Sequence, residues 1–154
     1  IRDNEPYLIE YNIRMGDPEC QVILPRLKTD IVKILKNMSL NKLKNTNLKW
    51  KDKKCMTIVM CAKGYPGKYK KNIPIKNLKK VRQTKTDYIY HAGTKLLNNK
   101  IIATGGRVLN VTSIGNSFFE IRRKIISNIK KINWNKGFYR RDIGWKIIKK
   151  NENY

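Results

Sequence analysis

Acidic residues, histidine and cysteine are all scarce in this sequence. Its 154 residues include 11 Asp and Glu against 35 Lys and Arg, with one histidine and three cysteines. No stretch is long and apolar enough to predict a membrane-spanning helix, and no apolar secretory signal follows Ile1. An initiator methionine is also absent at this end. We therefore expect a globular piece of a longer chain, with no membrane partner.

The three cysteines, Cys20, Cys55 and Cys61, form no pattern typical of a zinc site or a disulfide framework. Their number is odd and no Cys-x-x-Cys pair is present. Cys55 and Cys61 share one face of an apolar run, but along an extended strand they are too far apart to bridge. We interpret the cysteines as small buried apolar residues in a protein of the reducing cytoplasm.

The formal net charge of +24 admits two interpretations. Such a charge favours nucleic acid or an acidic membrane surface as a partner. The lysines, however, are spread along almost the whole chain, and no zinc-finger, basic-zipper or organised aromatic and basic pattern accompanies them. A basic nucleic-acid-binding module is therefore the second hypothesis, and no specific nucleic acid is expected as a partner.

The first forty residues predict one strand and two helices. Polarity alternates from Pro6 to Arg14, which is typical of a half-buried strand with a polar face. Asp17 is a candidate N-cap for a short helix. A second helix is predicted to begin near Asp30, and the residues it should bury at helical spacing are Ile31, Ile34, Leu35 and Met38. Because the connector 37–47 has poor periodicity, we expect a boundary there and domains spanning 1–40 and 41–154.

The rest of the chain predicts an antiparallel sheet with one packed helix, an α+β fold. Strands are expected at 55–61, 88–91, 95–97, 100–103 and 107–112, with a turn at Asn98-Asn99. Pro66-Gly67 predicts a type II turn. A helix should follow Ser117, and its apolar stripe consists of Phe118, Ile121, Ile125, Ile129 and Ile132.

Glu10 and Asn12 form the first candidate site. They stand two residues apart on one face of the predicted strand, about 7 Å apart at the Cα atoms. A carboxylate and an amide oxygen are hard donors of the kind magnesium prefers. From spacing alone, a solvated polar strand face is the more frequent outcome, so both interpretations stay open.

Several separated motifs carry a family resemblance. They are Tyr7 to Gln21, Leu24 to Asp30, Gly64-Tyr65-Pro66-Gly67, His91-Ala92-Gly93-Thr94, Gly105 to Leu109, and Arg141 to Trp145. In this order, over nearly the whole chain, they resemble the C-terminal part of the phosphoribosylamine-glycine ligases, a family of the ATP-grasp superfamily.

The resemblance implies ligation in purine biosynthesis. ATP would phosphorylate the glycine carboxylate, and the amine of 5-phosphoribosylamine would attack the acyl phosphate. Glu10 and Asn12 match the family pair that binds magnesium or manganese, so the resemblance assigns them to the metal. The resemblance also implies the fold of this chain: the last strand and helices of an ATP-grasp domain, followed by a small antiparallel β domain.

Four further residues are candidates for substrate contacts. Arg14 could hold the carboxylate or acyl phosphate as a catalytic residue, and a structural salt bridge is comparably plausible. Asp17 and Glu19 could bind the substrate amine or ribose, or only favour the start of a helix. Arg107, after two glycines, could bind the sugar phosphate, although a glycine pair can simply permit a turn.

The family resemblance also implies what this chain should lack. The pre-ATP-grasp region, the phosphate-covering loop, the adenine-contacting hinge and an earlier metal ligand would all precede Ile1. We therefore expect an N-terminal portion of the ligase as partner and no ligase activity from the isolated chain. A related ATP-grasp carboxylate-amine ligase with another substrate is the third hypothesis.

Overall fold

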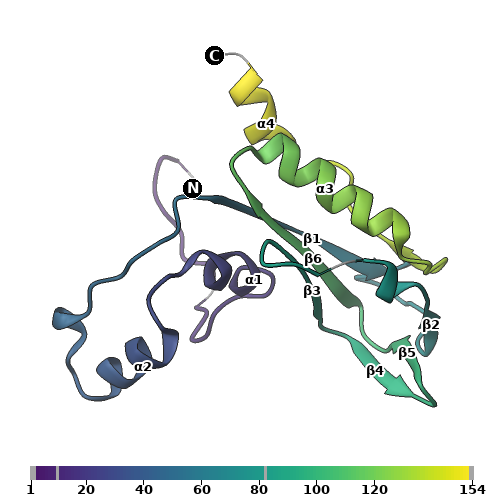
Figure 1. The fold of residues 1–154 in the computed structure, drawn as a ribbon, viewed down its shortest axis with the longest axis horizontal. Helices are drawn as coiled ribbons and strands as arrows, with labels where there is room; N and C mark the ends of the chain where they lie inside the picture. Colours follow the sequence, from purple (N-terminus) through teal and green to yellow (C-terminus); the bar gives the residue numbers. More distant parts are fainter. Residues whose placement is uncertain (1–2, 10, 82, 153–154) are drawn as a thin grey trace.

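The centre of the molecule is a four-stranded antiparallel sheet in the order β3-β6-β1-β7 (Figure 1). The structure, a computed structural model, describes residues 3–9, 11–81 and 83–152. The sheet consists of β1 (Lys54–Ala62), β3 (Asp87–His91), β6 (Arg107–Gly115) and β7 (Gly137–Phe138). Strand β6 pairs with β1 from Arg107 to Gly115 and with β3 on its other edge, so it occupies the interior of the sheet.

A smaller antiparallel sheet continues beyond one end of the central sheet (Figure 1). It contains β2 (Ile73–Ile75), β5 (Lys100–Ala103) and β4 (Thr94–Leu97) in that order. Strands β4 and β5 form a hairpin in which Asn98 and Asn99 have φ values of 46° and 59°. Asparagine tolerates this left-handed conformation, which two-residue hairpins require, and the predicted turn is confirmed.

Helix α3 (Phe118–Lys131) covers one face of the central sheet and closes the hydrophobic core. Ile121, Ile125 and Ile129 are buried at helical spacing, against strand residues such as Ile58 and Val111. Burying each such side chain contributes roughly 1.5 to 3 kcal/mol before the cost of ordering the chain. The expected α+β fold with a packed amphipathic helix is confirmed.

The remaining helices are short. They are α1 (Cys20–Ile23), α2 (Ile31–Ser39), α4 (Trp145–Glu152) and the 3-10 turns η1 (Leu24–Arg26), η2 (Leu43–Asn45) and η3 (Leu78–Lys80). Helix α1 contacts β1 and β6, whereas α2 extends away from the sheet (Figure 1). Among the described helices, none is both long and apolar enough to cross a bilayer.

Helix α2 begins as predicted, but it does not bury its apolar stripe. The Asp30 side chain caps it by accepting a hydrogen bond from the backbone N–H of Val32 at 2.8 Å. Leu35 and Met38 are nevertheless about half exposed, at 50% and 51%. The expectation that α2 is buried is therefore wrong here, because helical periodicity identifies an apolar face without specifying what covers it.

The strand predicted over residues 6–14 does not form in the described part of this segment. Residues 6–9 and 11–14 are not in strand conformation, and Ile9 and Ile13 are 94% and 99% exposed. Alternating polarity produces a half-buried strand only where a neighbouring strand can pair with its backbone. Glu10 lies outside the described residues.

The turn after β1 also differs from its prediction. Gly67 does not have the positive φ that a type II turn over Pro66-Gly67 requires, whereas Gly64 has φ of 104°. A Cβ atom on Gly64 would lie 2.2 Å from the carbonyl oxygen of Lys68. The backbone conformation therefore requires glycine at position 64 and not at position 67.

A buried carboxylate ties β3 to β6 and α3. Asp87 is 3% exposed and accepts hydrogen bonds from Thr84 Oγ1 at 2.6 Å and Ser113 Oγ at 2.7 Å. Lys124 Nζ lies 2.7 Å from its Oδ2. Burial opposes ionisation of this carboxyl, but the hydrogen bonds from Lys124, Thr84 and Ser113 outweigh it and hold the pKa of Asp87 below its ordinary value.

Replacing Asp87 with asparagine should lower the free energy of unfolding by about 2 kcal/mol at pH 7, the scale of lost charged hydrogen bonds. A carboxyl with a lowered folded-state pKa stabilises the fold above its unfolded pKa and loses that contribution as the pH falls through the folded value. The difference between Asp87→Asn and the parent protein should therefore shrink towards pH 3. Urea unfolding across pH measures it.

The control for Asp87→Asn is Asp142→Asn. Asp142 also pairs with a cation, Arg140, with Nη2 2.5 Å from Oδ2, but it lies on the surface. Its replacement should change stability little. Equal effects of the two substitutions at pH 7 would contradict the role assigned to Asp87.

Candidate functional site

The face of the central sheet opposite α3 is polar at its centre. Residues paired across antiparallel strands share a face, and Thr57 of β1 pairs with Thr112 of β6. Thr112 Oγ1 donates a hydrogen bond to Thr57 Oγ1 at 2.7 Å. On the neighbouring strand the rings of Tyr88 and Tyr90 stack with centroids 5.8 Å apart. This face is therefore built from hydroxyl and aromatic groups, and α1 and η1 contact its strands.

Arg107 joins the first residue of β6 to the N-terminal segment. Its Nη1 donates a hydrogen bond to the backbone carbonyl of Asp17 at 3.0 Å, and its Nη2 lies 3.4 Å from Asp17 Oδ2. Asp17 Oδ1 also accepts a hydrogen bond from Gln21 Nε2 at 2.8 Å. These contacts bring together two of the predicted site residues, Arg107 and Asp17, which are far apart in the sequence.

The Arg107–Asp17 pair is still accessible to a ligand. The side chains of Arg107 and Asp17 are 43% and 34% exposed. A guanidinium has five N–H donors, and the contacts with Asp17 use only part of them. A planar donor group with free N–H bonds can bind a phosphate or a carboxylate in a bidentate way.

Two buried amides belong to the same elements that frame this pair, Gln21 in α1 and Asn110 in β6. Gln21 Oε1 and both amide atoms of Asn110 are buried and have no hydrogen-bond partner among the described residues. Asn110 is 1% exposed and pairs in register with Val59 and Tyr90, on the polar face of the sheet. Buried unpaired amides are uncommon, because desolvation without a hydrogen bond costs roughly 1 to 3 kcal/mol.

Sequence patterns do not indicate a role for Gln21 or Asn110. Gln21 follows Asp17 by four residues, a spacing that places two side chains together on one helical turn. Asn110 is a single polar residue within the apolar run Val108-Leu109-Asn110-Val111. A polar residue inside an apolar run is the sequence signal that marks it.

The glycine pair before Arg107 serves packing in this structure. A Cβ atom on Gly105 would lie 2.9 Å from the Cα atom of Gly93. A Cβ atom on Gly106 would lie 2.2 Å from the ring of Tyr65. Glycine at both positions thus allows two loops and a tyrosine ring to approach the start of β6.

The other predicted site residues lie on the surface. Arg14 is exposed and donates a hydrogen bond from Nη1 to the carbonyl of Met15 at 2.9 Å. Glu19, not the expected Asp17, occupies the N-cap position of α1, and it makes no side-chain cap hydrogen bond. Asn12 is exposed, and its expected partner Glu10 lies outside the described residues. Within the described ranges, no group of three or more His, Cys, Asp or Glu could hold a metal.

Histidine and cysteine do not form a nucleophilic site in the described residues. His91 Nδ1 lies 2.9 Å from Thr94 Oγ1 within one turn, which is a structural contact. Burial raises the pKa of the Cys55 thiol to about 11, although Arg26 partly opposes the shift. Burial also raises the pKa of Cys61. Both thiols are therefore protonated near neutral pH and are weak nucleophiles.

Comparisons with known proteins agree on one family. Residues 55–146 match the family model described as "Phosphoribosylglycinamide synthetase, C domain". The chain is 45% identical over 143 residues to a phosphoribosylamine–glycine ligase of Agrobacterium fabrum, covering 93% of this chain and 33% of that protein. It is 42% identical over 149 residues to a chloroplastic one of Arabidopsis thaliana, covering 96% of this chain and 28% of that protein.

A solved structure shows the same fold. The crystal structure of a phosphoribosylamine–glycine ligase from Thermotoga maritima matches with a TM-score of 0.67 and 29% sequence identity. The match covers 91% of this chain and 34% of that one. The chain spans about a third of the length of these relatives. The sequence, the fold and the relatives together place this chain in the phosphoribosylglycinamide synthetase family, and its residues 55–146 match that family's C domain.

Proposed function

We propose that this chain forms the C-terminal part of an ATP-dependent ligase that joins glycine to 5-phosphoribosylamine in purine biosynthesis. Its relatives carry the name phosphoribosylamine–glycine ligase. The observation that carries the proposal is the accessible Arg107–Asp17 pair, which offers a cation and a carboxylate side by side. A phosphorylated amine presents the complementary charges. The three free cysteines support the reducing cytoplasm as its compartment.

Arg107 and Asp17 would have complementary roles in substrate binding. The guanidinium of Arg107 would bind the phosphate of phosphoribosylamine through its free N–H donors. The carboxylate of Asp17 would face the amine or the ribose, and Gln21 would keep that carboxylate in place. Glu19 and Arg14, both exposed, would contribute from the N-terminal segment, Arg14 towards the carboxylate or acyl phosphate of glycine.

Glu10 and Asn12 would hold the metal. Their carboxylate and amide oxygens are donors that suit Mg²⁺, and Mn²⁺ accepts the same kind of ligand. Two protein ligands leave room for water and the phosphates of ATP, as is usual for magnesium in phosphoryl transfer. When bound, the metal would neutralise phosphate oxygens while the γ-phosphoryl group moves to glycine.

The N-terminal segment exposes apolar side chains, which suits a docking surface for the remainder of the ligase. Tyr7, Ile9, Tyr11 and Ile13 alternate along the segment and are 62%, 94%, 81% and 99% exposed. A row of apolar side chains this exposed would be stabilised by contact with an apolar face. We propose that the segment pairs with an ATP-grasp sheet as a strand, within a first domain of residues 1–40, and that residues 41–154 form the second.

Replacing Arg107 tests the phosphate contact. In the complete ligase, Arg107→Ala should raise the KM for phosphoribosylamine about tenfold to a hundredfold, the effect of losing a charged hydrogen bond of roughly 1.5 to 3 kcal/mol. The KM values for glycine and ATP should change much less. Arg107→Lys, which keeps the charge but loses the planar fork, should recover only part of the affinity. Unchanged kinetics in a folded Arg107→Ala enzyme would make the residue structural.

Replacing Glu10 or Asn12 tests the proposed metal site. In the complete ligase, Glu10→Ala should raise the magnesium concentration needed for half-maximal activity more than Asn12→Ala does, because a carboxylate binds the cation more strongly than an amide. Titrating magnesium at saturating ATP, glycine and phosphoribosylamine measures this. Asn47→Ala, outside the predicted site, is the control. A Glu10→Ala enzyme with the parent magnesium dependence would exclude the metal assignment.

A further inference from the structure

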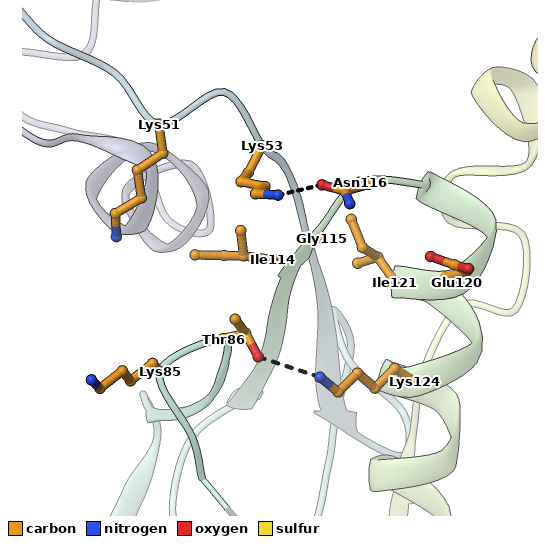
Figure 2. Close-up of a pocket in the computed structure, with 10 residues that line it drawn as sticks. All are labelled: Lys51, Lys53, Lys85, Thr86, Ile114, Gly115, Asn116, Glu120, Ile121 and Lys124. Atoms are coloured by element: carbon orange, nitrogen blue, oxygen red, sulfur yellow. Dashed lines mark hydrogen bonds between the residues drawn. The ribbon is translucent and has the colours of Figure 1, made fainter.

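A cavity lies at the end of β6 opposite to Arg107, and Figure 2 shows the residues that line it. Its volume is about 560 Å³, within the range of small-molecule sites. It lies between the segment before β1, the loop before β3, the end of β6 and the start of α3. Gly115, which ends β6, is part of its wall, so the cavity is about 26 Å along the strand from Arg107. This cavity, the Lys53 pocket, is therefore separate from the site proposed for the ligase.

Four lysines from three segments of the chain line the Lys53 pocket, and hydrogen bonds fix three of their ammonium groups. Lys53 Nζ donates to Asn116 Oδ1 at 2.6 Å, and Lys51 Nζ donates to the carbonyl of Pro25 at 2.7 Å. Lys124 Nζ is held by Asp87 and by Thr86 Oγ1, the latter at 3.3 Å (Figure 2). The fourth is Lys85. An ammonium has three N–H donors, so donors remain for a ligand, and a side chain already fixed loses less entropy on binding.

The charge of the Lys53 pocket matches a dianion. Glu120 lines the cavity and the buried Asp87 pairs with Lys124, so the four lysines and the two carboxylates together carry a net charge of about +2. A phosphate monoester carries about −1.5 to −2 near pH 7. Ile114 and Ile121 add apolar surface to the wall, which suits a carbon skeleton attached to the phosphate.

Two other lysine-lined hollows on this protein lack the same fixation. One, around Tyr69, is lined by Lys63, Lys68, Lys70 and Lys136. The other lies beside η3, and its lysines are Lys76, Lys79, Lys80 and Lys100. In the described part of the chain, no side-chain hydrogen bond or ion pair fixes these eight ammonium groups. Lysine enrichment alone thus does not distinguish the Lys53 pocket, but its fixed ammonium groups do.

We propose that the Lys53 pocket is a binding site for a small phosphate monoester with an apolar group. The phosphate lies between Lys53 and Lys85, which line the cavity from the segment before β1 and from the loop before β3 (Figure 2). Neither has a carboxylate partner among the described residues, and the third such lysine, Lys51, already donates to the carbonyl of Pro25. The apolar group contacts Ile114 and Ile121. The site is independent of the proposed ligase chemistry at Arg107.

The test is a titration of the ¹⁵N-labelled 154-residue chain with phenyl phosphate in 150 mM salt, followed by amide chemical shifts. Saturable shifts are expected at residues 114–117 and at Lys53. The double variant Lys53→Gln/Lys85→Gln should weaken binding about tenfold or more, as the loss of two charged contacts implies. Binding should also weaken from pH 7.5 to pH 5, where the monoester becomes a monoanion.

The matched controls are Lys68→Gln/Lys136→Gln and Lys79→Gln/Lys100→Gln, which remove the same charge from the other two hollows. Both should keep the parent affinity within about twofold, since screening weakens distant charges. Equal losses of affinity in all three double variants would mean that scattered lysines attract the anion. Chemical shifts that do not saturate would lead to the same conclusion. Either result overturns the proposal. Circular dichroism of each variant confirms that the fold is retained.

Discussion

Burial of β6 on both of its faces is the constraint on which the rest of this structure depends. Leu109 and Val111 point into the core beneath α3, while Asn110 and Thr112 point to the opposite face. A strand covered on both sides and paired on both edges has little freedom to shift its register, because a slip of one residue would exchange the two faces. The ends of β6 are therefore fixed points, and both candidate sites are built at those ends.

The scarce carboxylates organise a chain that has a large excess of cations. Asp17 holds Arg107 at one end of β6, and Asp87 holds Lys124 near the other. Most lysines are exposed and contribute little specific energy, since solvent and salt screen them. The net charge of +24 thus describes the surface, whereas the positions of a few acids decide where a cation is held in a defined geometry. For this reason charge alone was a poor guide to function.

The family relationship gives the exposed N-terminal segment a physical explanation. Its alternating apolar residues and the half-exposed stripe of α2 have the pattern of buried surface, yet little in the described chain covers them. The compact part of the structure, from β1 through α3, overlaps the matched C domain and has its own core. The exposed apolar surface is concentrated in the part of the chain before that domain. This contrast supports the proposal that the N-terminal segment packs against the remainder of a ligase.

The sequence by itself determined the local structure and the family. The strand after Lys54, the Asn98-Asn99 hairpin and the stripe of α3 follow from periodicity and turn chemistry, because these depend on neighbouring residues. The strand over residues 6–14 and the burial of α2 could not be decided in this way, since both depend on a partner surface. The pairing of Arg107 with Asp17 and the convergence of four lysines on one cavity were decided only by tertiary structure. Such contacts join residues that are distant in sequence, and no local sequence pattern specifies which distant side chain a residue will contact.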